Sequence, residues 1–379
     1  MLEPRNLRPL RELSRQDIED LLVGAKIMGT GGGGEVDWAR PLIDEIYRKK
    51  KRFRLVDPRD VPDSETVVIV SRIGGGITKE QEKKVENLPR IKERLDLVAF
   101  NLLSKYLGAD PYAVLPTELG AGNTIAALYA AAMLDKPAVD ADCVGRAKPE
   151  ISISSTNVRG VPVTPACLVT PFGDVLYLDK TLSDERAEDI LRAATAASGG
   201  HCGLCRCPMS GRVLRSSVVP NTVSLCIEIG KRIRESKKTG EDPVDSTVEL
   251  VNGVKLFEGN VASFSREGHG GFVWGDTIIR GSGAYSRHQL RIWYKNEHLI
   301  SWFDGKPYIT CPDSIFVVDA STGLGLSNWG GDFSKGREVV VFGRRAHRLF
   351  RTAKGLKVFS PKSFGYDIKY RPIERVAGL

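Results

Sequence analysis

The sequence predicts two domains, an N-terminal α/β domain with a mostly parallel sheet and a β-rich C-terminal domain. Two observations predict this organisation. In the first half, short apolar runs end in glycine-rich turns that lead into helices, as in strand–turn–helix units. After residue 248 the chain becomes a series of short apolar runs separated by glycine turns, which is typical of a sandwich or barrel. We place the α/β domain at residues 1–172 and the β-rich domain at residues 173–379.

The composition indicates a globular protein. Of the 379 residues, 41% are hydrophobic and 27% are charged, which is enough apolar material for a large core. No apolar run reaches the roughly 18–20 residues of a membrane span, and the N-terminus lacks the apolar core of a signal peptide. We therefore expect a cytoplasmic protein that does not bind membranes, and we expect it to form a homo-oligomer. Scarce glutamine beside plentiful Lys, Arg and Glu favours a thermophile.

The net charge of +8 suits anionic partners, but the basic residues are scattered along the chain. The densest run, residues 48–52, lies at the end of a predicted helix, where cations interact favourably with the helix dipole. A solvated helix end explains this run better than a nucleic-acid patch does. We therefore expect a small-molecule substrate and no nucleic acid.

A first helix is expected to begin after Ser14, because Asp17 stands where a capping box places its acidic residue. The helix ends before the run of four glycines at residues 31–34, and a second helix is expected from Asp37 to about Arg48. Glycines ahead of a helix leave backbone N–H groups free to approach an anion. The alternative is a plain turn between two helices. The candidate substrate-binding residues here are Thr30, Gly31, Gly32 and Gly33.

A buried strand is expected at residues 67–70, and it runs into a second glycine cluster at residues 74–76. Two helices follow, at residues 79–86 and at about residues 90–107. The N-terminal part thus repeats the order strand, glycine-rich turn and helix.

The stretch from Val114 to Ala147 organises the predicted site. A strand ends at Pro116, a glycine turn leads into a helix at residues 124–134, and a second short strand covers residues 138–139. Parallel strands joined in this way share an edge at their carboxyl ends, where ligands bind in open α/β sheets. Three acidic residues follow these strand ends: Glu118, Asp140 and Asp142.

These acidic residues have two chemical uses. Carboxylates close together raise one another's pKa, so that one becomes a general acid and another a base. Alternatively they hold a divalent cation that activates water. Arg146 would neutralise them or bind a substrate carboxylate with two hydrogen bonds. A structural network that caps the sheet is the alternative to both.

A second candidate site is a short segment rich in soft metal ligands. Its four residues, His201, Cys202, Cys205 and Cys207, have the composition of a zinc or iron–sulfur half-site. No second Cys-x-x-Cys pair accompanies them, and a single loop can supply four ligands only with difficulty. Reduced structural thiols and a disulfide are therefore the alternatives to a bound divalent metal such as zinc.

The β-rich half contributes polar residues beside its strands. Strands are expected at residues 254–257, 271–275, 290–294, 315–318 and 339–342. Asn296 and Glu297 follow one strand, and Asp313 precedes another. Ordinary turns are the alternative explanation for these residues.

Taken in order, the motifs resemble the S-methyl thiohydantoin desulfurase-like family, whose members are often associated with hydantoinases. The matching segments are residues 28–34, 118–123, 139–147, 271–275, 294–297, 312–315 and 364–367. The resemblance implies an N-terminal α/β domain, a β-rich C-terminal domain and hydrolytic desulfurisation of a thiohydantoin-type ring. The segment at residues 201–207 and the basic charge depart from the family pattern.

We therefore expect a hydrolase acting on a small cyclic amide or thioamide. Asp140 or Asp142 would serve as base or metal ligand, Glu118 as acid, and the glycine-loop N–H groups as stabilisers of the intermediate. The alternative is a non-catalytic ligand-binding or regulatory subunit of a hydantoinase-type system, because no nucleophile–base pair is recognisable.

The site is expected in one crevice near the junction of the two domains, since pockets favour such interfaces. The N-terminal residues expected to line it with the glycine loop are Glu118, Asn123, Asp140, Asp142 and Arg146. The β-rich domain would add Asn296, Glu297 or Asp313 from its own loops.

Overall fold

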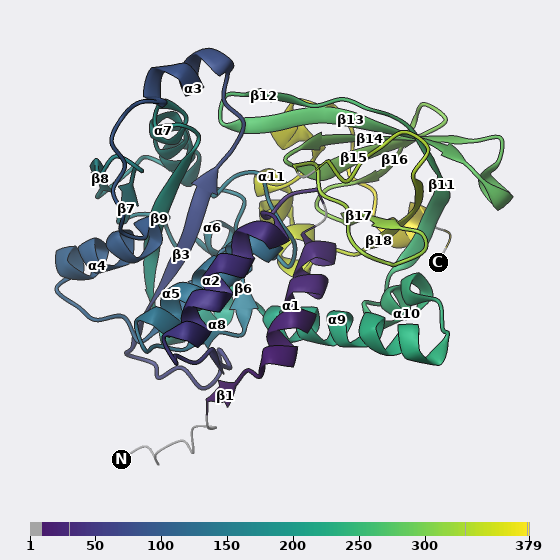
Figure 1. Ribbon diagram of the computed structural model, residues 1–379. Coiled ribbons are helices and arrows are strands. Elements are labelled where there is room, and N and C mark those ends of the chain that lie inside the picture. The colour runs from purple at the N-terminus through teal and green to yellow at the C-terminus, as the bar shows by residue number, and fades with distance from the viewer. Residues whose placement is uncertain (1–9, 30, 330, 377, 379) are drawn as a thin grey trace.

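The structure, a computed structural model, describes residues 10–29, 31–329, 331–376 and 378. Two lobes lie side by side, an α/β lobe built from the first part of the chain and a β-rich lobe from the last part (Figure 1). The β-rich C-terminal part agrees with the sequence prediction. None of the described helices pairs the length with the apolar character that a bilayer-spanning segment needs.

The first lobe is built on an eight-stranded mixed sheet. Its strands, in spatial order, are β1 (Arg11–Glu12), β2 (Arg54–Val56), β5 (Ala138–Val139), β4 (Ala113–Pro116), β3 (Thr66–Gly74), β9 (His201–Ser210), β7 (Ala166–Val169) and β8 (Val175–Leu178). Only the neighbours from β2 to β3 pair in parallel, and every other pair is antiparallel. The expected mostly parallel sheet is therefore corrected to a mixed one. β9 returns along β3 in the opposite direction, and β7 and β8 form a tight hairpin closed at Gly173.

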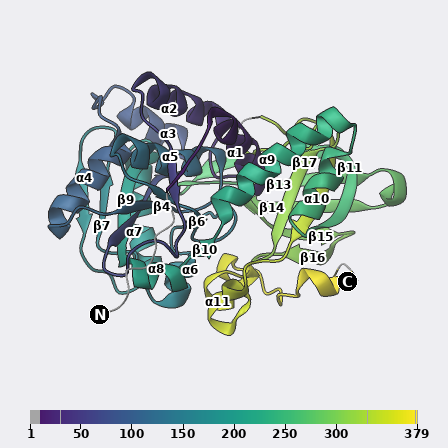
Figure 2. The same ribbon diagram turned by 90° about the horizontal axis from the view of Figure 1, so that it is seen from below.

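Helices cover this sheet, and their ends follow from the sequence. The first turn of α1 (Arg15–Met28) carries the expected capping box between Ser14 and Asp17. The helix α5 (Ala121–Met133) is built from small apolar residues and is almost wholly buried, which lets strands and helices pack on all its sides. The other helices before the second sheet are α2 (Val36–Arg48), α3 (Lys79–Val85), α4 (Leu95–Leu107), α6 (Ser155–Arg159), α7 (Asp184–Ala197), α8 (Gly211–Ser217), α9 (Thr222–Thr239) and α10 (Pro243–Leu250). The helix α9 runs from the α/β lobe towards the β-rich lobe, against which α10 lies (Figures 1 and 2).

The second lobe is an antiparallel sheet with its own apolar core. Its strands, in spatial order, are β16 (Lys306–Thr310), β15 (Glu297–Phe303), β14 (Gln289–Lys295), β13 (Phe272–Gly281), β11 (Val254–Phe264), β18 (Glu338–Arg344) and β17 (Ser314–Asp319), while β12 (Glu267–His269) pairs with β13. The remaining short elements are η1 (Gly283–Tyr285), η2 (Arg348–Arg351), α11 (Ala353–Val358), η3 (Pro361–Phe364) and α12 (Ile373–Val376). In the view from below, α11 lies between the two lobes at the lower edge of the picture (Figure 2).

The chain changes sheets well after Gly173. The strands β8 and β9 belong to the first sheet, and β10 (Val219–Pro220) pairs with β6 (Ala141–Asp142) beside it. The second sheet receives its first strand, β11, at Val254. The predicted boundary between residues 172 and 173 therefore precedes two strands of the first sheet.

The glycine run at residues 31–34 lies where the two lobes meet. The carbonyl oxygen of Gly33 accepts hydrogen bonds from the backbone N–H groups of Gly122 and Asn123, at 3.1 and 3.0 Å. Gly31 donates to the carbonyl of Leu326 and accepts from the N–H of Asn328, each at 3.1 Å. One short loop thus hydrogen-bonds to the start of α5 and to the β-rich lobe.

Close backbone approach explains why this loop consists of glycine. Gly33 has a φ of +71°, and a Cβ added there would lie 2.6 Å from the Cα atom of Gly120. Both the left-handed conformation and the contact exclude a side chain.

We expect Gly33→Ala to lower the free energy of unfolding by at least about 1 kcal/mol more than a matched glycine substitution does, because strain and overlap add. Gly336 is the matched control, since its φ is +87° and an added Cβ would have no neighbour within 4 Å. Urea denaturation of both variants checks this. Equal destabilisation would show that only the conformation matters and that the contact with Gly120 contributes nothing.

Asp142 stabilises the turn that follows β6. Its carboxylate accepts hydrogen bonds from the backbone N–H groups of Val144, at 2.9 Å, and Gly145, at 2.8 Å. The side chain is completely buried, and burial raises the pKa of Asp142 to about 7 in spite of these hydrogen bonds. The folded protein therefore holds a proton that the unfolded chain loses near pH 4.

This difference predicts that stability falls as the pH rises from about 4 to about 7, by at most about 1.4 kcal/mol per pH unit from this one group. Asp142→Asn, which cannot ionise, is expected to show a smaller loss over the same interval. The matched control is Asp110→Asn, at an exposed position. Denaturation midpoints at pH 4, 5, 6 and 7 measure the slope, and an unchanged slope in Asp142→Asn would contradict the assignment.

Candidate functional site

A cavity of about 460 Å³ lies at the junction of the two lobes. From the first sheet, the end of β3 and the segments after β4 and β6 line it, and from the second lobe, the start of β15 does so. Its polar lining includes Ser71, Arg72, Thr117, Glu118, Asn123, Lys148, Glu150, Arg192, His201, Asn296 and Glu297. The carboxyl edge of the parallel strands thus carries the cavity, as expected for open α/β sheets.

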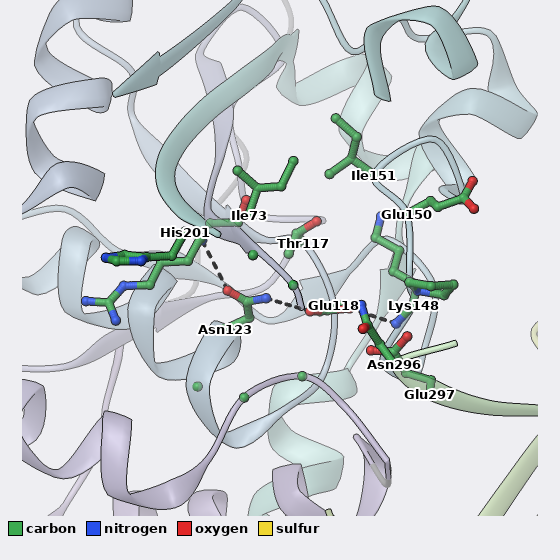
Figure 3. Close-up of a pocket in the computed structure, with 18 of the residues that line it drawn as sticks. Ile73, Thr117, Glu118, Asn123, Lys148, Glu150, Ile151, His201, Asn296 and Glu297 are labelled. Atoms are coloured by element: carbon green, nitrogen blue, oxygen red, sulfur yellow. Dashed lines mark hydrogen bonds between the residues drawn. The ribbon is translucent and has the colours of Figure 1, made fainter. Parts of the chain in front are cut away.

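Glu118 lies at the centre of this group (Figure 3). One carboxylate oxygen accepts a hydrogen bond of 2.6 Å from the side-chain amide of Asn123, and the other accepts one of 2.7 Å from the backbone N–H of Lys148. Asn123 is held in turn by the backbone N–H of Arg72, at 3.1 Å. Burial raises the pKa of Glu118 above its usual value although these hydrogen bonds favour the ionised form. The carboxyl group is therefore held on both oxygens, while burial favours its protonated form.

Lys148 is the residue that sequence reasoning missed. Its side chain is 6% exposed, and its Nζ has no hydrogen-bond partner among the described residues. Burial lowers the pKa of Lys148, since a charged ammonium is poorly solvated there. An unpaired buried amine is costly unless it interacts with something that binds in the cavity. Nothing in the local sequence, including the adjacent Pro149, indicates that this lysine is buried.

Glu297 enters from the second lobe. The preceding residue, Asn296, has a φ of +58° and exchanges hydrogen bonds with the backbone of Val273, at 2.6 and 2.8 Å. This turn directs Glu297 into the cavity, where its Oε2 has no partner within the described part of the chain. Burial, with the nearby charge of Glu118, raises the pKa of Glu297 well above its usual value. In Figure 3, Lys148, Asn296 and Glu297 gather on one side of Glu118, and Asn123 lies on the other.

The glycine loop forms the floor beneath these groups. Gly33 and Gly34 line the cavity. A Cβ on Gly32 would overlap the carboxyl group of Glu297, so Gly32 makes room for that side chain. Gly31 lies against Asn328 and the backbone of Glu297, and neither glycine lines the cavity. Thr30 lies outside the described residues. The apolar walls are made by Trp38, Ile73, Ile151 and Trp329, of which the two tryptophans meet edge to face at 6.1 Å.

Four predicted site residues lie elsewhere. Asp140 accepts hydrogen bonds from the N–H and hydroxyl of Ser224 at the start of α9, because β5 ends one residue earlier and the chain turns away from the cavity. Asp142 holds the turn after β6. Asp313 accepts hydrogen bonds from Ala346, Tyr370 and Ile373.

Arg146, the fourth, joins the lobes. Its guanidinium donates to the carbonyl oxygens of Asp313, at 3.1 Å, and His298, at 2.6 Å, and it is 4% exposed. These backbone bonds occupy the donors that a substrate carboxylate would need. Arg146 therefore has a structural role in holding the second lobe in place.

The cysteine segment forms β9. Strand alternation places Cys202 and Cys205 on opposite faces, and an irregularity at Cys207, whose φ is +56°, turns that residue away from the face of Cys205. The three thiols therefore lie in three different apolar clusters, and burial raises the pKa of each. His201 is exposed at the mouth of the cavity. Throughout the described ranges, no three His, Cys, Asp or Glu side chains converge as metal ligands. The residues therefore do not fit the expected zinc site, because a strand separates ligands that a loop could have gathered.

One similar solved structure is a protein from Chromobacterium violaceum, determined by X-ray crystallography in a structural genomics programme. It is 25% identical to this chain, the match covers 96% of this chain and all of that one, and the TM-score is 0.75. The likeness extends over both lobes. A comparison with curated proteins gives no match.

Two family descriptions match nearly the whole chain. The S-Me-THD-like N-terminal domain matches residues 16–180, and the S-Me-THD-like C-terminal domain matches residues 182–373. The division between them falls between β8 and α7. This chain belongs to the S-Me-THD-like family.

Proposed function

We propose that the cavity catalyses hydrolysis of a small cyclic thioamide or amide, of the thiohydantoin or hydantoin type. One observation carries the proposal: the buried Lys148 amine, without a partner in the described structure, shares the cavity with the carboxyl groups of Glu118 and Glu297. Burial lowers the pKa of the amine and raises the pKa of the carboxyl groups. Groups shifted in this way can serve as the base and the acid of a hydrolysis near neutral pH.

Lys148 is the base in this proposal. Its lowered pKa increases the fraction of neutral amine, which can take a proton from a water molecule. Glu118 lies beside it, held on both oxygens, and orients that water. The water oxygen then bonds to the ring carbon that carries sulfur.

Glu297 is the acid. Burial raises its pKa and so favours the protonated form, which can donate its proton to the leaving sulfur as the carbon–sulfur bond breaks. Lys148 then holds the first proton of the attacking water. The second leaves the new hydroxyl as the ring carbon becomes a carbonyl, and it goes to the ring nitrogen when the sulfur departs as a thiol, or to the sulfur when it departs as hydrogen sulfide. Transfer of the proton from Lys148 to Glu297 returns both groups to their starting states. With a cyclic amide, the proton from Glu297 would go to the ring nitrogen and the ring would open.

The cavity suits a ring of this size. Its volume of about 460 Å³ lies in the range of small-molecule sites, and flat apolar walls face a few fixed polar groups. Turnover of hydantoin, thiohydantoin and S-methylthiohydantoin by the purified chain in ¹⁸O-labelled water tests the proposal. We expect one label on the product carbonyl. No turnover, together with stoichiometric capture of a hydantoinase from the native source, would instead support a non-catalytic subunit.

Lys148→Ala is expected to lower kcat/KM at least about 100-fold, since general base catalysis contributes that much or more. Added ethylamine should restore part of the activity, because it fits the space that the side chain leaves. Lys136→Ala is the matched control: this lysine is also largely buried but pairs with Asp110 away from the cavity. Circular dichroism verifies folding.

Lys148→Met keeps the packing of the side chain but lacks the amine, so the base role predicts that this variant also loses activity when folded. Activity that survives in folded Lys148→Met but not in Lys148→Ala would leave Lys148 with a packing role only. Full activity in either variant would contradict the mechanism outright.

A further inference from the structure

A second cavity, of about 610 Å³, opens where the segment 144–146 meets the end of β18 and η2. We call it the arginine cavity. It is defined by Arg146, Arg344, Arg345, His347, Arg348 and Arg351. Nothing in the proposed reaction uses it.

The positive charge of this cavity is only partly neutralised by the protein. Arg351 forms a two-pronged ion pair with Glu374, at 2.8 Å for both contacts. Among the described residues, no carboxylate lies within ion-pair distance of Arg344, Arg345 or Arg348. Three guanidinium groups therefore face one hollow without counter-ions.

The nearest acidic side chains are already engaged. Asp313 accepts hydrogen bonds from Ala346, Tyr370 and Ile373, and Asp142 accepts from the turn after β6. Burial lowers the pKa of Arg344, and the charge of Arg345 adds to this effect, while Cys226 and Asp142 offset only part of it. Arg344 would therefore be stabilised by an anion.

A polar group in the same wall lacks a partner. The Nδ1 atom of His347 is buried without a hydrogen bond in the portion of the chain that the structure describes. Ser314 and Asn252 add polar side chains to the lining. The lining thus combines positive charge with polar side chains.

We propose that the arginine cavity binds a small molecule carrying two or more linked phosphate groups, such as a nucleoside diphosphate. A planar guanidinium group donates two parallel hydrogen bonds to phosphate oxygens. The cavity has more arginines than a single phosphate group can pair with, which favours a ligand with two or more phosphates. The basic groups converge in a hollow rather than forming a stripe, which favours a compact ligand over the backbone of a nucleic acid. The proposal is independent of the reaction assigned to the first cavity.

Isothermal titration of the full chain with pyrophosphate, ADP and malonate tests it. We expect saturable one-to-one binding of pyrophosphate and ADP, and affinity for malonate at least 10-fold weaker. If ADP binds more tightly than pyrophosphate, the cavity also recognises the nucleoside. If the two bind equally well, it recognises the diphosphate alone.

The double variant Arg345→Gln/Arg348→Gln should weaken pyrophosphate binding at least 10-fold, since both side chains are exposed at the cavity and their removal leaves the core intact. Arg280→Gln/Arg287→Gln is the matched control, because it removes the same charge from exposed positions that do not line the arginine cavity. The control should stay within 2-fold of the wild type.

Three results would overturn the proposal. These are no saturable pyrophosphate binding, equal weakening in both double variants, or binding of a short DNA duplex that displaces pyrophosphate and depends on the same two arginines.

Discussion

The backbone contact between Gly33 and Gly120 is the constraint on which the first cavity depends. It joins the turn between α1 and α2 to the start of α5 without any side chain between them, and Gly33 also accepts hydrogen bonds from that helix. The same loop reaches the β-rich lobe through Gly31. A side chain at Gly33 would push the loop away from the start of α5. Because Gly31 of the same loop is bonded to the β-rich lobe, this contact helps to set how closely Glu297 approaches Glu118 and Lys148.

Close approach has an electrostatic consequence. Glu118, Lys148 and Glu297 come from three segments, and each is at most 6% exposed. Burial shifts the pKa of each in the direction that favours its uncharged form. Burying such groups without full pairing opposes folding, and arrangements of this kind are concentrated at functional sites. The pairing of Arg146 with backbone carbonyls of the second lobe keeps the groups together.

Much of this site could be predicted from local sequence. Glycine turns after apolar runs correctly located the carboxyl edge of the sheet, and Glu118, Asn123, Asn296 and Glu297 do line one cavity with Gly33. The structural role of Asp140 could not be predicted from local sequence, because its hydrogen-bond partner Ser224 comes 84 residues later in the chain. Lys148 carries no pattern that distinguishes it from a surface lysine. The cysteine segment could be interpreted as a metal loop since its strand character depends on pairing with β3 and β7, which only the folded sheet supplies.

The state of the Lys148 amine is the central claim, and it can be measured directly. NMR titration of ¹³C-methylated lysines, with Lys148 assigned by its absence in Lys148→Arg, reports the pKa of this one group. The account predicts a pKa clearly below the usual 10.5, because burial disfavours the ammonium. Titration at or above the usual value, as for a solvated or ion-paired lysine, would contradict it.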